Sequence, residues 1–299
     1  MKIRKINILL AISLGAVFAF SGCEKDDGAI PKRVSISDVP TITTNIDATG
    51  STIINVLNST TAATFAGKFK VDNYFPGATP PTKVDIVVRK NGSNANVKLY
   101  KANVTSLPAS YTVTAAEIAT LFGVAVVTGD TYDFAPDIYV GDKKYEAFPA
   151  IGAGTGAGLN GQPFYGEFAR YLALCQDVNF HQGNFEVISD AFPNGFTPGQ
   201  VIALTKVTDT RFSFLSTFVT SPVAIVVNIS PTTNQLSITK QKIGNAFTWN
   251  LAQTNPNVAV AAGATNFIEP CGRTIELNIT YSTDQILFPG TYLLKLRKL

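Results

Sequence analysis

Histidine is almost absent from this chain of 299 residues, which contains one histidine, one methionine and one tryptophan. A single histidine, His181, excludes any metal centre built on two histidines. Its segment, Asn179–Gly183, has the composition of a turn between strands, so we expect an exposed histidine with a structural role. The alternative is a catalytic base in a Ser-His-Asp triad. That alternative lacks support because the chain has no Gly-x-Ser-x-Gly elbow.

Charge of either sign is also scarce, at 15% of the sequence. Residues 1–22 hold three basic residues and no acidic one, so the remainder has 21 Lys plus Arg against 21 Asp plus Glu. Nucleic-acid binding requires a basic surface, so we expect neither nucleic acid nor anionic lipid as a partner. The glycine-rich places, 152–161 and the turn at Gly195, lack the lysine and Ser/Thr placement of a phosphate loop. We therefore expect no cofactor.

A largely apolar run of fifteen residues, 6–20, follows three basic residues at the N-terminus. A membrane-spanning helix needs roughly 20 apolar residues, and the small residues after this run are typical of a cleaved signal peptide. The segment Phe20-Ser21-Gly22-Cys23 resembles the lipobox of bacterial lipoproteins, although Phe20 replaces the usual aliphatic residue. The resemblance implies that residues 1–22 are removed and that Cys23 is lipidated. Plain secretion with a thiol at Cys23 is the alternative.

The residues after the cysteine, Glu24-Lys25-Asp26-Asp27, resemble the acidic export signal of Bacteroidetes lipoproteins. The resemblance implies an outer-membrane protein whose lipid anchor holds it at the cell exterior, with residues 23–33 as a tether. The alternative is a solvated polar tether without an export role, because charged residues beside a lipid anchor are expected in any case.

Thr, Val, Asn, Gly and aromatic residues are abundant in the rest of the chain, which indicates a mainly β protein. Its length exceeds the usual size of one domain. We expect two β-sandwich domains: one at 34–150, then a glycine-rich linker at 151–168, then a second at 169–299. For the repeated short strands of the second, a flattened barrel is the alternative to a sandwich. One long loop inside a single large sandwich is the alternative.

Local patterns predict individual elements. Val84–Arg89 alternates apolar and polar residues, and Asn91-Gly92 favours a turn that pairs this strand with 97–100. A second hairpin is expected around Gly141-Asp142, joining 138–140 to 145–148. The one predicted helix is short, with a capping box from Thr114 to Glu117 and an end at Gly123. Further strands are expected at 223–229, 236–238, 274–281 and 292–297.

Two cysteines, Cys175 and Cys271, lie in the predicted second domain. An exterior compartment permits a disulfide. The bond would close a loop of about 97 residues, for which the chain-entropy model gives on the order of 4 to 5 kcal/mol. Two separately buried thiols are the alternative, and either arrangement is structural.

The whole arrangement resembles Bacteroidetes surface lipoproteins of the SusE-like, glycan-import-associated type. The resemblance includes the region 112–134, with its short helix, Leu121-Phe122-Gly123 and Gly129-Asp130. It implies an immunoglobulin-like or fibronectin-like N-terminal domain and a second β domain with a cysteine near each end. Since a sandwich hosts many functions, the resemblance bears on fold and location more than on ligand.

Aromatic residues give the one chemically directed indication of a ligand, because sugar rings stack their C–H faces on flat side chains. Trp249 has amide residues on both sides, and Phe164, Tyr165, Phe168 and Tyr171 gather after the glycine-rich segment. We take Trp249, Phe164 and Tyr165 as candidate polysaccharide-binding residues. The alternatives are a tryptophan in the core and an aromatic group that packs a domain interface.

Asp130, Asp133 and Asp137 form the densest carboxylate cluster. Glycosidases need two carboxylates about 5 to 10 Å apart, but carboxylates in loops are usually solvated or cap turns, which is the role that we expect. The spacing departs from that of a calcium-binding loop. We therefore expect no catalytic residue and no metal site.

Three functions are compatible with the sequence. The first is a non-catalytic, glycan-binding or accessory lipoprotein of a SusCD-like nutrient-import system. The second is a structural or protein-interaction module, adhesin-like or associated with an outer-membrane porin. The third is a hydrolase, which requires a cleft with convergent carboxylates or His181 paired to a nucleophile.

Overall fold

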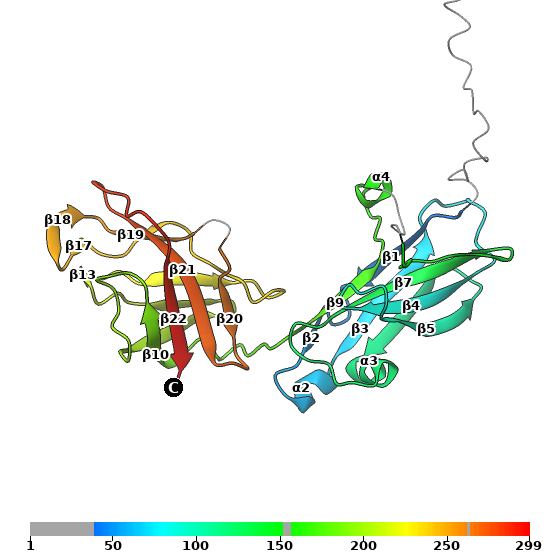
Figure 1. The fold of residues 1–299 in the computed structure, drawn as a ribbon, viewed down its shortest axis with the longest axis horizontal. Helices are drawn as coiled ribbons and strands as arrows, with labels where there is room; N and C mark the ends of the chain where they lie inside the picture. Colours follow the sequence, from blue (N-terminus) through cyan, green and yellow to red (C-terminus); the bar gives the residue numbers. More distant parts are fainter. Residues whose placement is uncertain (1–38, 152–156, 262–263) are drawn as a thin grey trace, which may run out of the picture. The chain divides into compact units, whose positions relative to one another are not determined.

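A computed structural model describes residues 39–151, 157–261 and 264–299 (Figure 1). The chain is mainly β, as predicted, and its helices are short. The predicted signal peptide, the lipidation site Cys23 and the tether at 23–33 lie outside the described residues. Among the described helices, none combines the length and the apolar character that crossing a membrane requires.

The first half of the described chain contains two sheets. The three-stranded sheet has the order β1–β3–β6, with β1 (Ile42–Asp47), β3 (Ala66–Asn73) and β6 (Ala109–Thr114). The second sheet has the order β2–β9–β7–β4–β5, with β8 paired to β7. Its strands are β2 (Ile53–Asn55), β4 (Lys83–Lys90), β5 (Val97–Val104), β7 (Thr131–Val140), β8 (Lys143–Tyr145) and β9 (Ala169–Leu174). All pairs are antiparallel except β2 with β9.

These two sheets share one core. Phe69 and Val71 of β3 lie in the same buried cluster as Ile86 of β4 and Phe134 of β7. The rings of Phe69 and Phe134 are 5.0 Å apart. Because each strand alternates inward apolar residues with outward ones, the two sheets pack face to face as a β-sandwich.

β9 departs from the predicted domain division. Residues 169–299 were expected to form the second domain, but β9 pairs with β7 and β2 of the first sandwich. Tyr171 of β9 is buried in that core, where its ring meets Phe65 at 5.3 Å. Phe168 packs at the same sheet, against a small cluster around Phe148. A glycine-rich segment predicts a lack of packed structure but not a domain boundary. Here the strand after the segment, β9, joins the same sheet as the strands before it.

The predicted local elements are confirmed. β4 pairs with β5, and both turn residues, Asn91 and Gly92, have the positive φ angles that the prediction required. β7 pairs with β8 around Gly141, but β8 covers 143–145 in place of the predicted 145–148 because the turn is tighter. The helix is α3 (Ala115–Phe122), whose capping box joins Thr114 and Glu117. Its C-cap, Gly123, has a φ of 70°. The structure adds α2 (Ser59–Ala63) and α4 (Ala157–Asn160), which are too short to leave a clear pattern in the sequence.

The second half is built mainly from one ten-stranded sheet of order β15–β14–β12–β11–β10–β22–β21–β19–β16, with β20 paired to β21. Its strands are β10 (Gly183–Asp190), β11 (Val201–Thr208), β12 (Arg211–Phe214), β14 (Ile225–Ile229), β15 (Leu236–Ser237), β16 (Gln241–Lys242), β19 (Asn257–Val260), β20 (Phe267–Glu269), β21 (Thr274–Ser282) and β22 (Tyr292–Lys298). A small sheet adds β13 (Val219–Thr220), β17 (Ala246–Phe247) and β18 (Asn250–Thr254).

The large sheet curls into a half-barrel around a second core. Along β21 the burial alternates strictly, and Ile275, Leu277, Ile279 and Tyr281 face the inside as predicted. An isolated β-bridge joins Gln235, the residue before β15, to Phe267 of β20, so the end of the sheet that carries β15 lies next to β20. One sheet therefore bends round its core in place of two flat layers.

Candidate functional site

Trp249 lies at the tip of the hairpin between β17 and β18. Phe247 pairs with Asn250, so Thr248 and Trp249 are the two turn residues. The side chain of Trp249 is 36% exposed, and its ring stacks on that of Phe247 with centroids 4.2 Å apart and an interplanar angle of 24°. One face of the indole is thus packed while part of the side chain is accessible to a ligand.

An aromatic cluster fixes the indole in place. Phe247 is fully buried, and the rings of Phe192 and Phe218 lie 5.6 Å and 6.1 Å from that of Trp249. Phe192 in turn stacks on Tyr281 of the half-barrel at 4.2 Å. Rings that are in contact on several sides have little rotamer freedom, so the indole is a rigid platform.

Exposed polar side chains flank Trp249 along the chain, and exposed apolar ones lie on β18 and in the loop after β21. Asn245, Thr248 and Asn250 are exposed. Leu251 on β18 and Leu287 in the loop after β21 are 67% and 73% exposed. The platform therefore offers both hydrogen-bonding groups and apolar surface.

The loop after β21 is tied to the end of β18. The amide of Thr254 donates to the side chain of Gln285 at 3.1 Å, and the side-chain amide of Gln285 donates to the hydroxyl of Thr254 at 2.9 Å. The amide of Asp284 also donates to the carbonyl of Thr254. These bonds hold the exposed apolar residues of the loop in a fixed position.

The structure places the other two predicted aromatic residues at the surface of the first half. Phe164 is 92% exposed and has a φ of 62°. Side chains hold its turn: Asn45 donates to the carbonyl of Phe164 at 3.2 Å, and the Tyr74 hydroxyl donates to that of Pro163 at 2.9 Å. The ring of Tyr74 also meets that of Tyr165 edge-on at 5.3 Å. Tyr74, distant in sequence, had no signal of its own.

Phe164→Gly is expected to raise the free energy of unfolding by about 0.5 to 1 kcal/mol. A left-handed conformation costs a non-glycine residue roughly 1–2 kcal/mol, and glycine loses about 0.5–1 kcal/mol through its greater freedom when unfolded. The exposed ring contributes little packing that could be lost. Urea unfolding measures the change. Phe164→Ala is the matched control, because it removes the ring and keeps the strain; an equal effect of both variants would contradict the prediction.

The expected exposure of His181 is wrong. The residue lies in a turn, as predicted, but its side chain is only 1% exposed. The ring Nε2 lies 2.9 Å from the carbonyl of Thr208, and burial lowers the pKa of His181. The polar turn composition did not reveal that a carbonyl on β11 meets the imidazole and makes its burial possible.

The expected solvation of Asp130, Asp133 and Asp137 is also wrong, since they are 5%, 0% and 5% exposed. The other expected role, capping of a turn, is found at Asp130, which accepts from the amide of Val127 at 3.1 Å. Tyr132 and Phe134 alternate with the acidic residues and point into the core, so the segment forms β7 instead of a loop. The carboxylates of Asp133 and Asp137 consequently lie on the outer face of the sheet, beside basic residues of neighbouring strands.

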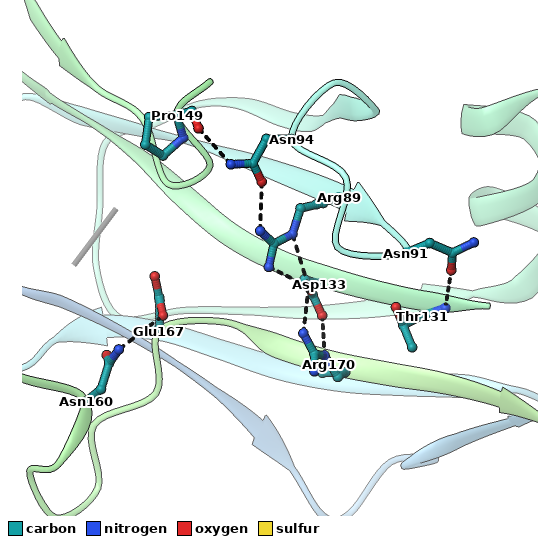
Figure 2. A network of polar contacts seen from close by, with 9 residues as sticks. All are labelled: Arg89, Asn91, Asn94, Thr131, Asp133, Pro149, Asn160, Glu167 and Arg170. Carbon is teal, nitrogen blue, oxygen red and sulfur yellow. Dashed lines mark hydrogen bonds and ion pairs between the residues drawn. The ribbon is translucent and has the colours of Figure 1, made fainter. Parts of the chain in front are cut away.

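Asp133 joins two arginines (Figure 2). Arg89 of β4 donates to its carboxylate from Nη2 at 2.8 Å and Nε at 3.2 Å. Arg170 of β9 donates from Nε at 2.6 Å and Nη2 at 3.0 Å. The network continues from Arg89 to Asn94, at 2.7 Å, and from Asn94 to the carbonyl of Pro149. The two guanidinium groups therefore share one buried carboxylate.

Aromatic rings cover the two guanidinium groups. The guanidinium carbon of Arg89 lies 4.2 Å from the ring centre of Phe148, and that of Arg170 lies 4.8 Å from that of Phe168. A cation over a ring face is favourable. These rings therefore pack against the ionic network of the first sandwich.

Asp130 and Asp137 are engaged as well. Asp130 accepts from Lys90, Asn91 and Tyr132 at 2.9 to 3.0 Å. Burial by itself raises the pKa of Asp130, but these hydrogen bonds hold it below its ordinary value. Asp137 pairs with Lys144 at 2.8 Å. Because their bonds explain all three carboxylates structurally, the cluster gives a hydrolase no support.

The predicted disulfide between Cys175 and Cys271 is present, with Cα atoms 5.8 Å apart. Glu269 lies close enough to both sulfurs to form the only group of potential metal ligands in the described part of the chain. Disulfide sulfurs are not thiolates, and thiolates are what a metal binds. This group is therefore a covalent cross-link beside a carboxylate.

Comparisons with known proteins do not identify a relative. The chain matches no protein family, no curated protein and no solved structure. The resemblance to SusE-like lipoproteins therefore depends on the residue pattern alone.

Proposed function

We propose that this protein is a non-catalytic lipoprotein, anchored to the outer membrane through Cys23 and facing the cell exterior. In this proposal it binds polysaccharide as an accessory of a SusCD-like nutrient-import system that includes an outer-membrane porin. The observation that carries the ligand class is the rigid, partly exposed indole of Trp249 on Phe247.

A rigid aromatic platform suits a sugar ring. In this proposal the apolar C–H face of a pyranose stacks on the indole, and the exposed side chains of Asn245 and Asn250 bond hydroxyl groups of the sugar. Since Trp249 is already held by its neighbours, binding immobilises few additional side chains, which lowers its entropic cost. The formal neutrality of residues 23–299 favours an uncharged polysaccharide.

In this proposal the lipid anchor on Cys23 holds the protein at the membrane. One acyl chain gives only marginal membrane binding, whereas two give stable anchoring. A diacylglyceryl group on Cys23 meets that requirement, and the acidic residues that follow it form a solvated tether. A glycan captured by the protein would in this way be retained at the membrane that contains the importer.

Trp249→Ala is expected to abolish capture of polysaccharide. The test is affinity electrophoresis of the mature protein, residues 23–299, through gels that contain a panel of neutral polysaccharides. Retardation by at least one polysaccharide should be lost in Trp249→Ala, with affinity reduced about tenfold or more, equivalent to about 1.4 kcal/mol.

Val201→Ala is the control for this experiment, because it truncates an apolar side chain that is 52% exposed on another strand. It should migrate like the unaltered protein. If no polysaccharide retards the protein, or if Trp249→Ala is retarded as strongly, glycan binding at this platform is wrong.

A second function is favoured by the exposed apolar side chains beside the platform. Leu251 and Leu287 suit contact with a protein, such as a porin subunit, better than contact with a sugar. A structural or protein-interaction role predicts that Leu251→Ser and Leu287→Ser reduce association with that subunit and leave retardation by polysaccharide unchanged. The glycan-binding role predicts loss of retardation in Trp249→Ala alone.

A further inference from the structure

The outer face of the six-stranded sheet holds a pocket of about 380 Å³. It lies within the size range of small-molecule sites, about 300–1,000 Å³. Its lining includes the acidic residues Asp85, Asp137 and Glu146 together with Lys98 and Lys144. The sequence showed no sign of this pocket, because its residues come from four separate segments.

Strand register builds the pocket. On β4 and β7, Asp85 is opposite Asp137 and Val87 is opposite Ala135. Val87, Ala135 and Phe148 form a small buried apolar cluster on this face. The pocket thus has apolar side chains in its floor and charged side chains around them.

The polar groups of the pocket are held in fixed directions. Lys144 lies 2.8 Å from Asp137 and 3.3 Å from Glu146. The backbone amide of Ala147 donates to Asp137 at 2.9 Å, and Asn94 is fixed by the Arg89 network. Because these contacts within the protein fix the side chains, their donors and acceptors are arranged in advance.

Asp85 and Asp137 occupy opposed positions on neighbouring strands, and both line the pocket. Each carboxylate has a cation nearby, since Lys83 lies 3.9 Å from Asp85 and Lys144 lies 2.8 Å from Asp137. A carboxylate has about four acceptor sites. Both side chains therefore keep acceptor sites for further hydrogen bonds.

The side chains that line the pocket suit a ligand rich in hydroxyl groups better than a ligand that carries charge of one sign. Carboxylates accept hydrogen bonds, whereas the ammonium groups of Lys98 and Lys144 and the amide nitrogen of Asn94 donate them. A strongly charged ligand would meet residues of its own sign. A hydroxyl group both donates and accepts, so a ligand rich in hydroxyl groups matches both kinds of partner.

We propose that this pocket is a second carbohydrate site that holds a monosaccharide, or one or two sugar units at the end of a glycan. The sugar lies over Val87 and Phe148, and Asp85, Asp137 and Glu146 accept hydrogen bonds from its hydroxyl groups. The ligand class rests on the proposed function, but the site is separate from the Trp249 platform.

Isothermal titration calorimetry of the mature protein, residues 23–299, with glucose, galactose, mannose, maltose and cellobiose tests the pocket. At least one sugar should bind. Asp85→Asn and Glu146→Gln should each weaken binding about tenfold or more, because each replaces a charged acceptor. Trp249→Ala should leave the affinity for these sugars unchanged.

The variants separate the two sites. The side chain of Glu146 is 50% exposed, so Glu146→Gln should fold normally, and thermal melting verifies this. Absence of binding by every sugar overturns the pocket proposal. Binding by both pocket variants that is as tight as binding by the unaltered protein also overturns it. Retardation by polysaccharide that depends on Trp249 would persist in that case. If no polysaccharide retards the unaltered protein but a small sugar binds it, binding at the Trp249 platform is overturned and the pocket proposal stands.

Discussion

Asp133→Asn is expected to lower the free energy of unfolding by about 3 kcal/mol or more. The carboxylate is fully buried and accepts hydrogen bonds from both Arg89 and Arg170. Asparagine keeps the shape but removes the charge, which leaves the two guanidinium groups without the carboxylate that they share. Arg170 can turn to solvent because half of its side chain is exposed, whereas Arg89 is 16% exposed and bears most of the cost.

Urea unfolding of the two proteins measures this change, with Asp209→Asn as the control. Asp209 pairs with Lys206 at 2.7 Å but is 70% exposed, so its loss should have a much smaller effect on stability. A second variant, Asp133→Leu with Arg89→Met, removes the buried charge on both strands and should recover much of the stability. Similar small effects of Asp133→Asn and Asp209→Asn would show that the network does not stabilise the fold.

Loss of the disulfide is expected to have the second large effect. Cys175 and Cys271 are 96 residues apart, and the chain-entropy model gives about 4 to 5 kcal/mol for a loop of that length. Cys175→Ser with Cys271→Ser should therefore lower the free energy of unfolding by about that amount. Urea unfolding with and without a reductant measures it.

The double cysteine variant is also its own control, because a reductant should no longer change its stability. The single variants should match the double variant, since either one removes the bond. If reduction leaves the unaltered protein as stable as before, the cross-link contributes nothing to the fold.

Features that depend on neighbouring residues were predictable from the sequence. The capping box of Thr114 and Glu117, the turn at Asn91-Gly92 and the alternation along β21 all involve residues a few positions apart. Local conformational preference decides such features. Their prediction therefore did not require the tertiary fold.

Features that depend on distant partners were not predictable in this way. Asp133 is separated from Arg89 by 44 positions and from Arg170 by 37, and only strand pairing brings them together. His181 is buried because Thr208, 27 positions away, supplies a carbonyl. A composition rule that assigns polar residues to solvent fails wherever the fold provides such a partner.

The candidate sites also combine features that neighbouring residues determine with features that depend on distant ones. Trp249 was identified as a ligand-binding candidate from its amide neighbours, but its exposure depends on contacts with Phe192 and Phe247. The carbohydrate pocket depends on the register of β4 against β7. Neither the packing nor the register leaves a signal in one sequence.

The position of β9 has a consequence for the order in which the chain folds. Synthesis from the N-terminus produces β7 before β9, and until β9 is made part of one edge of β7 lacks its partner strand. Exposed strand edges promote association between chains, and pairing of distant segments is slow. The nascent sandwich is therefore most open to aggregation while the residues between β7 and β9 are being made.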